Sequence, residues 1–155
     1  MDTLSAEQLA WELLEKHHLN HWKFRFDYAK RRFGSCDYHK RTITLSKHLT
    51  LLNPKSEVRD TLLHEIAHAL TPGDNHGLKW QAKCLELGAK PLRCYETEQV
   101  NQPEPSYLLV CTKCRKKYPR YRKTKGVYVC RACCDRYNEG KPSHKYRLYW
   151  LEVSS

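Results

Sequence analysis

Two histidines and a glutamate occur together as His64-Glu65-Ile66-Ala67-His68, in a stretch whose apolar residues recur at helical spacing. Residues four apart project from the same side of a helix, so the imidazoles of His64 and His68 can bind one ion. Glu65 is next to a ligand and is a residue type that takes a proton from an attacking water. We therefore predict that Glu65 is a catalytic base beside a metal ion.

A catalytic zinc site needs three protein ligands and one open position. His76 is the best candidate for the third ligand, because residues 71–75 (Thr-Pro-Gly-Asp-Asn) can turn the chain back after the helix. The following Gly77 is expected to let the backbone pass close to the site. Neutral imidazole suits zinc, so we predict a catalytic Zn²⁺ held by His64, His68 and His76, where water is activated for peptide-bond hydrolysis.

The alternative for this segment is that His64 and His68 are ordinary histidines of a buried helix and that His76 is a solvated loop residue. That interpretation leaves Glu65 unexplained among apolar neighbours. A buried carboxylate is costly without a partner, and this favours the metal site.

Four cysteines follow the pattern Cys111-x2-Cys114, fifteen intervening residues, then Cys130-x2-Cys133. Each pair aims two sulfurs at one ion, so the pattern predicts a second, structural Zn²⁺ in a small β zinc ribbon. Cys134 is an alternative fourth ligand, although the two-residue spacing favours Cys133. The metal here can be purely structural, because so small a module buries little apolar surface by itself.

Positive charge is concentrated in the ribbon. Residues 107–155 hold 13 Lys and Arg against 3 Asp and Glu, whereas residues 1–106 hold 15 against 14. Such a module is typical of proteins that bind a polyanion, and DNA is the expected partner. The candidate nucleic-acid contacts are the cations between the two cysteine pairs: Arg115, Lys116, Lys117, Arg120, Arg122, Lys123 and Lys125.

Tyr118, Tyr121 and Tyr128 are interleaved with these cations. Aromatic faces stack on exposed bases while cations neutralise phosphates, so the pattern indicates single-stranded or distorted DNA. The alternatives are a solvated basic tail and tyrosines that are ordinary strand residues.

The remaining elements must position these groups. Helical spacing predicts a helix up to about His17, a short helix over 46–52, a helix that carries His64 to His68 and ends before Pro72, and another that stops at Gly88. Alternation over 22–28 and a β-branched run at 42–45 predict two strands. The fold class is therefore α+β, with a first domain over 1–96, a polar linker over 97–106 and the ribbon over 107–155.

The bulk composition excludes several classes of protein. A length of 155 residues suits one compact domain and a small module, and no stretch approaches the ~20 apolar residues of a membrane span. The N-terminus lacks the basic start and apolar run of a secretory signal. We expect the protein to be located in the cytoplasm, associated with the nucleoid, or in the nucleus, and not to be secreted. In such a compartment its eight cysteines are expected to be reduced rather than paired in disulfides.

Together these segments resemble the SprT-like family, which includes proteases of the Spartan type. The His-Gly-x-x-aromatic segment and the ribbon are more discriminating than the HExxH motif, which many zincins share. The matching segments follow the family's order over roughly residues 4–150: Gly34-Ser35-Cys36, Thr42-Ile43-Thr44-Leu45-Ser46, residues 64–70, His76-Gly77-Leu78-Lys79-Trp80 and the two CxxC pairs.

The resemblance implies a zincin-like metalloprotease domain with His76 as third ligand, joined to a zinc-binding module. It also implies that the substrate is protein bound or crosslinked to DNA, with DNA promoting cleavage. The strand around 42–45 would then pair with an extended substrate by strand addition. Two alternatives are a non-enzymatic nucleic-acid-binding protein with a structural HExxH zinc, and a metallopeptidase that is independent of DNA.

Overall fold

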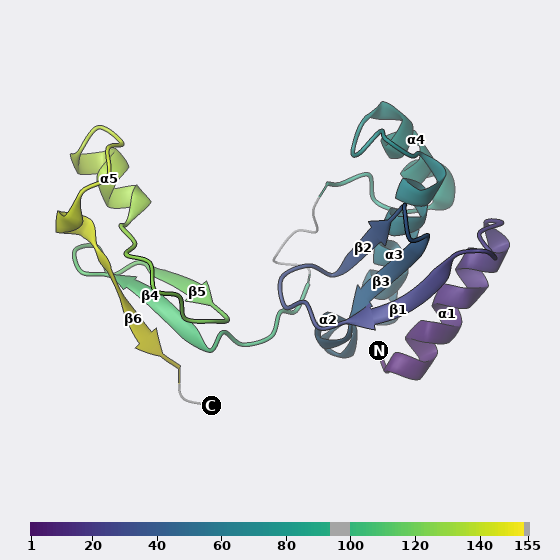
Figure 1. Ribbon diagram of the computed structural model, residues 1–155, viewed down its shortest axis with the longest axis horizontal. Helices are drawn as coiled ribbons and strands as arrows, with labels where there is room; N and C mark the ends of the chain where they lie inside the picture. The colour runs from purple at the N-terminus through teal and green to yellow at the C-terminus, as the bar shows by residue number, and fades with distance from the viewer. Residues whose placement is uncertain (94–99, 154–155) are drawn as a thin grey trace. The chain divides into compact units, whose positions relative to one another are not determined.

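The computed structural model describes residues 1–93 and 100–153, which form two compact units (Figure 1). The first unit is Met1–Pro103 and the second is Glu104–Ser155. The predicted linker begins with residues 97–99, which lie outside the described residues. Helices and small sheets occur in both units, so the predicted α+β class is confirmed.

The first unit carries most of the helices. In chain order its elements are α1 (Thr3–Lys16), β1 (Lys23–Asp27), β2 (Gly34–Asp37), β3 (Thr42–Ser46), α2 (Lys47–Leu52), α3 (Lys55–Leu70) and α4 (Leu78–Leu87). The strand β2 was not predicted, because its half-buried residues show no alternation between apolar and polar side chains.

No helix in the described part of the chain is long and apolar enough to cross a membrane.

The three strands of the first unit form a mixed sheet in the order β1-β3-β2, as Figure 1 shows. β1 runs parallel to β3, and β2 runs antiparallel to it. The expectation that the strand around 42–45 pairs with a substrate is therefore wrong, because both sides of β3 are already paired. Its β-branched residues fit a central strand, and among the described residues the edges of this sheet are β1 and β2.

The core of the first unit lies between the sheet and two helices. Phe24, Ile43 and Leu45 belong to one buried cluster with the apolar residues of α1 and α3. α3 packs against α1 and α4 as well as against β2 and β3. It is thus supported on several sides, and a helix held in this way keeps the side chains that it presents in fixed positions.

The second unit is a small sheet with one short helix. α5 was not predicted, and it begins directly after Cys130, so the second cysteine pair lies at a helix start. The buried cluster of this unit consists of four cysteines and Tyr146, which fits a module that depends on a metal. Its elements are β4 (Tyr107–Cys111), β5 (Lys117–Arg120), α5 (Arg131–Tyr137), η1 (His144–Tyr146) and β6 (Leu148–Glu152), with the sheet order β5-β4-β6.

Asn53 fastens the end of the first unit to α2. Its side chain is buried, its Nδ2 donates to the carbonyls of Leu49 and Asn101 at 2.8 Å each, and its Oδ1 accepts from the Asn101 amide at 2.8 Å. We expect Asn53→Ala to lower the free energy of unfolding of this unit by about 1–3 kcal/mol, because buried polar groups lose their partners. Hydrogen exchange should show faster exchange of the Asn101 amide.

The matched control is Asn101→Ala, which removes one side-chain bond to the Leu52 carbonyl and keeps both backbone bonds to Asn53. It should leave the residue-101 amide nearly as protected as in the unmodified chain. Equal protection of this amide in Asn53→Ala and the unmodified chain would contradict the assignment.

Candidate active site and metal centres

The three predicted histidines converge. His64 and His68 lie one turn apart on α3, and His76 lies in the turn before α4. One ring nitrogen of each lies within 4.8 Å of the others, and the Nε2 atoms of His68 and His76 are 3.2 Å apart. Two nitrogens bound tetrahedrally to one zinc are about 3.4 Å apart. The cluster therefore fits a single ion, although its role as a ligand set stays a prediction.

Trp80 packs against all three imidazoles. Its ring centroid lies 4.7 Å from that of His64, 5.2 Å from that of His68 and 4.6 Å from that of His76. The indole is 1% exposed, and its Nε1 lies 3.4 Å from the His64 carbonyl oxygen. Trp80 thus packs against all three imidazole rings and restricts their positions. The sequence marked it only as a helix residue and as the aromatic of the His-Gly-x-x-aromatic segment.

Burial keeps these imidazoles neutral. Burial first, and then the neighbouring rings, lower the pKa of His64 and of His68 to about 4. The pKa of His76 is also lowered, first by burial and then by the charge of Arg93. Neutral imidazole has the lone pair that a metal needs, so the cluster is in its binding form at neutral pH.

The turn that brings His76 to the site is held by Asp74. Its Oδ2 accepts from the Trp80 amide at 2.9 Å, and its carbonyl accepts from the Gly77 amide at 2.9 Å. A Cβ at position 77 would lie 2.7–2.9 Å from the Asp74 carboxylate. The absence of a side chain at Gly77 therefore leaves room for this capping carboxylate, and the expectation that Gly77 lets the backbone pass close to the site stays a prediction. An acid just before a helix is the sequence signal that could have identified Asp74.

Glu65 lies on the inner side of α3 against β2. It is 7% exposed, and no hydrogen bond joins its carboxylate to another described residue. A Cβ at Gly34 would lie 3.1 Å from its Cγ and Oε1, so only glycine leaves room for it there. Burial raises the pKa of Glu65 to about 8, opposed by the charge of Arg32, and a bound cation would lower this pKa.

The Glu65 carboxylate opens into a pocket of about 260 Å³. Cys36 and Tyr38 reach this pocket from β2 and the turn after it. The sequence marked Cys36 only as part of a family-like segment and gave Tyr38 no role, because β2 was not predicted. The pocket lies between that strand, α3 and the turn after α3. Its lining is Cys36, Tyr38, Glu65, His68, Thr71, Pro72, Gly73 and Asn75.

The four predicted cysteines of the second unit also converge. The Sγ atoms of Cys111 and Cys133 are 3.8 Å apart, and those of Cys114 and Cys130 are 3.7 Å apart. Sulfurs bound tetrahedrally to one zinc are about 3.8 Å apart. Cys134 is buried nearby but is not part of this four-sulfur group, and every described cysteine is free of a disulfide.

Tyr118 supports the cysteine cluster. Its hydroxyl lies 3.2 Å from Cys130 Sγ, and backbone amides of Lys113 and Cys114 donate to Cys111 Sγ. Burial acts to raise the pKa of Cys130, but the Tyr118 hydrogen bond and other hydrogen bonds lower it to about 7. Tyr118 therefore contacts the cysteine cluster of its own module. This agrees with the alternative that the tyrosines are ordinary strand residues.

The seven candidate DNA-contacting cations lie on the surface of the second unit. Six are exposed, and Arg120 is half-buried. Arg115 donates to the Tyr149 hydroxyl at 3.3 Å, and none of the seven forms an ion pair with a carboxylate of a described residue. Their charge is thus available to a polyanion, and their contact with DNA stays a prediction.

The sequence profile of the SprT-like family matches residues 5–103, which include all three histidines and Glu65. Two solved structures show a weaker likeness. The metallopeptidase zymogen jannalysin of Methanocaldococcus jannaschii is 17% identical, with 61% of this chain and 85% of that chain covered and a TM-score of 0.47. The zymogen abylysin of Pyrococcus abyssi is 22% identical, with 50% and 74% covered and a TM-score of 0.44. No curated protein matches the chain.

We expect replacement of Trp80 to weaken metal binding at the histidines. Trp80→Ala should lower the zinc affinity of this site about 10–100-fold, because groups behind metal ligands contribute to their orientation. Trp80→Phe keeps a ring against the imidazoles and should lose less. Competition with a chromophoric chelator, at a temperature where both variants are folded, measures the affinity. A folded alanine variant with unchanged affinity would exclude a positioning role.

Proposed function

The chain belongs to the SprT-like family, and on this premise we propose that it is a zinc-dependent endopeptidase that cleaves proteins bound or crosslinked to DNA. The observation that carries the proposal is the Glu65 carboxylate, which has no hydrogen-bond partner among the described residues and opens into a pocket beside His68. A purely structural zinc site needs no acid at this position. The non-enzymatic alternative therefore explains the site less well.

The proposed roles follow from the geometry. His64, His68 and His76 hold the catalytic zinc, and the four-cysteine group holds a second, structural zinc. A zinc ion at the histidines supplies Lewis-acid polarisation and a water that is acidic near neutral pH. Glu65 takes the proton from the attacking water and passes it to the leaving amine, and the space at Gly34 lets its carboxylate reach the pocket.

The peptide substrate would lie along β2. This strand is at an edge of the sheet, Gly34 contacts Glu65, and Cys36 lines the pocket. An extended peptide that adds to this edge is held by main-chain hydrogen bonds. Recognition of this kind depends little on side chains, and it suits an enzyme that cleaves many different proteins.

The second unit would contact the DNA. None of the seven candidate cations between the cysteine pairs forms an ion pair with a described carboxylate, and a small module with a strong positive charge attracts phosphates. A peptidase that is independent of DNA remains the second candidate, and the basic character of the second unit speaks against it.

Glu65→Gln should abolish cleavage and keep the metal. The amide fills the same space but cannot take a proton, so we expect the rate of hydrolysis of a DNA-binding protein to fall at least 10²-fold. Zinc analysis should give two ions per chain, one for each cluster, in both the unmodified chain and the variant. Glu57→Gln, on the same helix in an ion pair with Lys90, is the control and should remain active. Unchanged cleavage by Glu65→Gln would reject the proposed base.

Removal of ribbon charge should weaken DNA binding in a salt-dependent way. The triple variant Lys116→Ala/Lys117→Ala/Lys123→Ala should bind single-stranded DNA less tightly, with a salt slope smaller by about 1 for each phosphate that the variant no longer neutralises. The matched control, Lys16→Ala/Lys55→Ala/Lys79→Ala, removes three exposed lysines from the first unit. Fluorescence anisotropy over a range of salt concentrations measures both quantities, and equal slopes in the two variants would count against the ribbon as the DNA module.

A further inference from the structure

Tyr28 is exposed where the sequence pattern places it on the buried side. Alternation along β1 puts it in line with Phe24 and Phe26, but the strand ends at Asp27 and the Tyr28 side chain is 71% exposed. Its ring lies next to the first turn of α2, with Lys47 Nζ 5.9 Å from the ring centroid and the His48 ring 6.0 Å away. The proposed function uses none of these residues.

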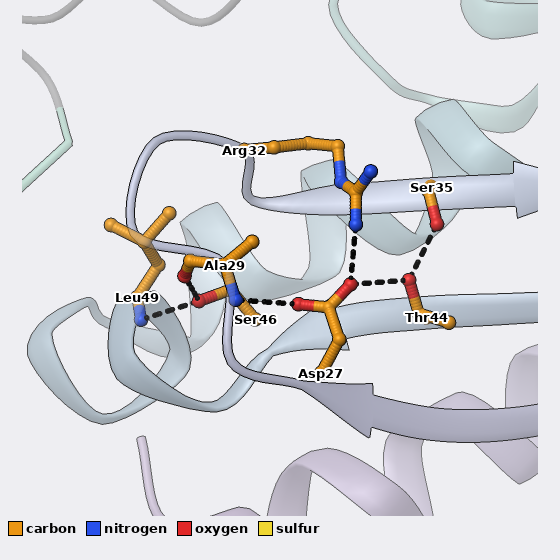
Figure 2. A network of polar contacts seen from close by, with 7 residues as sticks. All are labelled: Asp27, Ala29, Arg32, Ser35, Thr44, Ser46 and Leu49. Carbon is orange, nitrogen blue, oxygen red and sulfur yellow. Dashed lines mark hydrogen bonds and ion pairs between the residues drawn. The ribbon is translucent and has the colours of Figure 1, made fainter. Parts of the chain in front are cut away.

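The loop that carries Tyr28, residues 28–33, is braced by side chains of the sheet (Figure 2). Asp27 Oδ1 accepts from the Ala29 amide at 3.0 Å, and its Oδ2 accepts from Arg32 Nη2 at 2.7 Å and from Thr44 Oγ1 at 3.0 Å. The Ser46 hydroxyl donates to the Ala29 carbonyl. Both backbone groups of Ala29 are therefore held, and the loop presents its side chains from a fixed backbone.

Positively charged residues occur beside the exposed ring, in space and along the chain. Lys30 and Arg31 follow Tyr28 in the loop, and Lys47 flanks it from α2. We call Tyr28, Lys30, Arg31, Lys47 and His48 the Tyr28 platform.

The nearby carboxylate of Asp27 is occupied by its own partners. Burial acts to raise the pKa of Asp27, but hydrogen bonds from Ala29, Arg32 and Thr44 lower it below its usual range, so this carboxylate stays ionised and paired with Arg32.

The loop of the Tyr28 platform continues directly into β2, the strand that borders the pocket. Phe33 ends the loop, is 2% exposed, and its carbonyl accepts from the Ser46 amide at 2.7 Å. The next residue, Gly34, begins β2 and contacts Glu65. A ligand on the platform would thus be held at one end of the strand that borders the pocket.

We propose that the Tyr28 platform binds single-stranded nucleic acid, with one base stacked on Tyr28 and the backbone phosphates paired with Lys30, Arg31 and Lys47. An exposed aromatic ring between cations has the chemistry of such a site, because every base has a stacking face and every nucleotide a phosphate. The inference rests on the proposed association with DNA. It places a nucleic-acid contact in the first unit, in addition to the ribbon.

The test uses the full chain and a fluorescein-labelled oligothymidylate, with oligouridylate as a second arm to distinguish DNA from RNA. Tyr28→Leu keeps the apolar bulk and loses the stacking ring, so binding should weaken roughly fivefold or more. Lys30→Glu/Arg31→Glu should weaken binding and lower the salt slope by about 1 or 2. The control Lys23→Glu/Lys40→Glu changes two exposed lysines at the opposite end of the sheet and should bind nearly normally.

Photo-crosslinking with 4-thiothymidine gives a second, independent result. In the unmodified chain the crosslinked peptide should contain Tyr28. Affinities equal to that of the control for both platform variants, together with no crosslink at Tyr28, would overturn the proposal. Binding of fluorescein-labelled polyglutamate that is lost in both platform variants, without binding of either oligonucleotide, would assign the platform to an acidic protein and would overturn the proposal too.

The same measurements separate this proposal from the one for the ribbon. If the platform variants lose affinity and the ribbon triple variant does not, the platform stands and the ribbon contact fails. If only the ribbon variant loses affinity and Tyr28 is not crosslinked, the platform proposal fails. Circular dichroism of each variant confirms that it is folded.

Discussion

Packing of three imidazoles around the indole of Trp80 is the constraint on which the site depends. The rings must be close enough to share one ion, and such closeness is tolerated only while they are uncharged. Burial is the largest cause of their lowered pKa, and together with the neighbouring rings it brings the pKa of His64 and of His68 to about 4. Asp74 couples the same indole to the turn, because its carboxylate accepts the Trp80 amide and so fixes the segment that carries His76. Trp80 thus contacts all three rings and is also hydrogen-bonded to the turn that carries His76.

The parts of the site that sequence predicted are those whose geometry is local. His64 and His68 share a helix face because of the helical period, and each CxxC pair aims its own two sulfurs, so these ligands could be inferred from spacing. His76 was inferred from the turn-forming residues 71–75 that follow the helix. The residues that reach the site from β2 and the turn after it could not be assigned to it. Gly34 lies against Glu65 only because β2 packs on α3, and Cys36 and Tyr38 reach the pocket from that unpredicted strand. Tyr28 was misplaced because alternation does not show where a strand ends.

The two candidate metal clusters are built into their units in different ways. The first unit has an apolar core that includes Leu14, Ile43 and Leu63, and its histidines lie at the border of that core. The buried cluster of the second unit consists of Cys111, Cys130, Cys133, Cys134 and Tyr146, so three of its four candidate ligands belong to its core. So small a module buries little apolar surface by itself. A metal at the four-cysteine group would therefore contribute to the fold of the second unit, whereas the histidine cluster borders a core of apolar side chains.

One chain of hydrogen bonds links the loop of the Tyr28 platform to the edge strand beside the pocket. Asp27 of β1 accepts from Thr44 of β3, and the Thr44 hydroxyl lies 2.6 Å from that of Ser35 in β2 (Figure 2). The chain crosses the three strands in their order in the sheet, on the face opposite Ile43 and Leu45. Because Asp27 also holds Ala29 and Arg32, the carboxylate that holds the loop is linked through Thr44 to Ser35 of β2. The backbone pairing of β2 with β3 and its packing on α3 place Gly34 beside Glu65, and this side-chain chain adds a polar contact to the same edge strand. The polar residues that hold the loop of the exposed tyrosine therefore also contact the strand that borders the pocket.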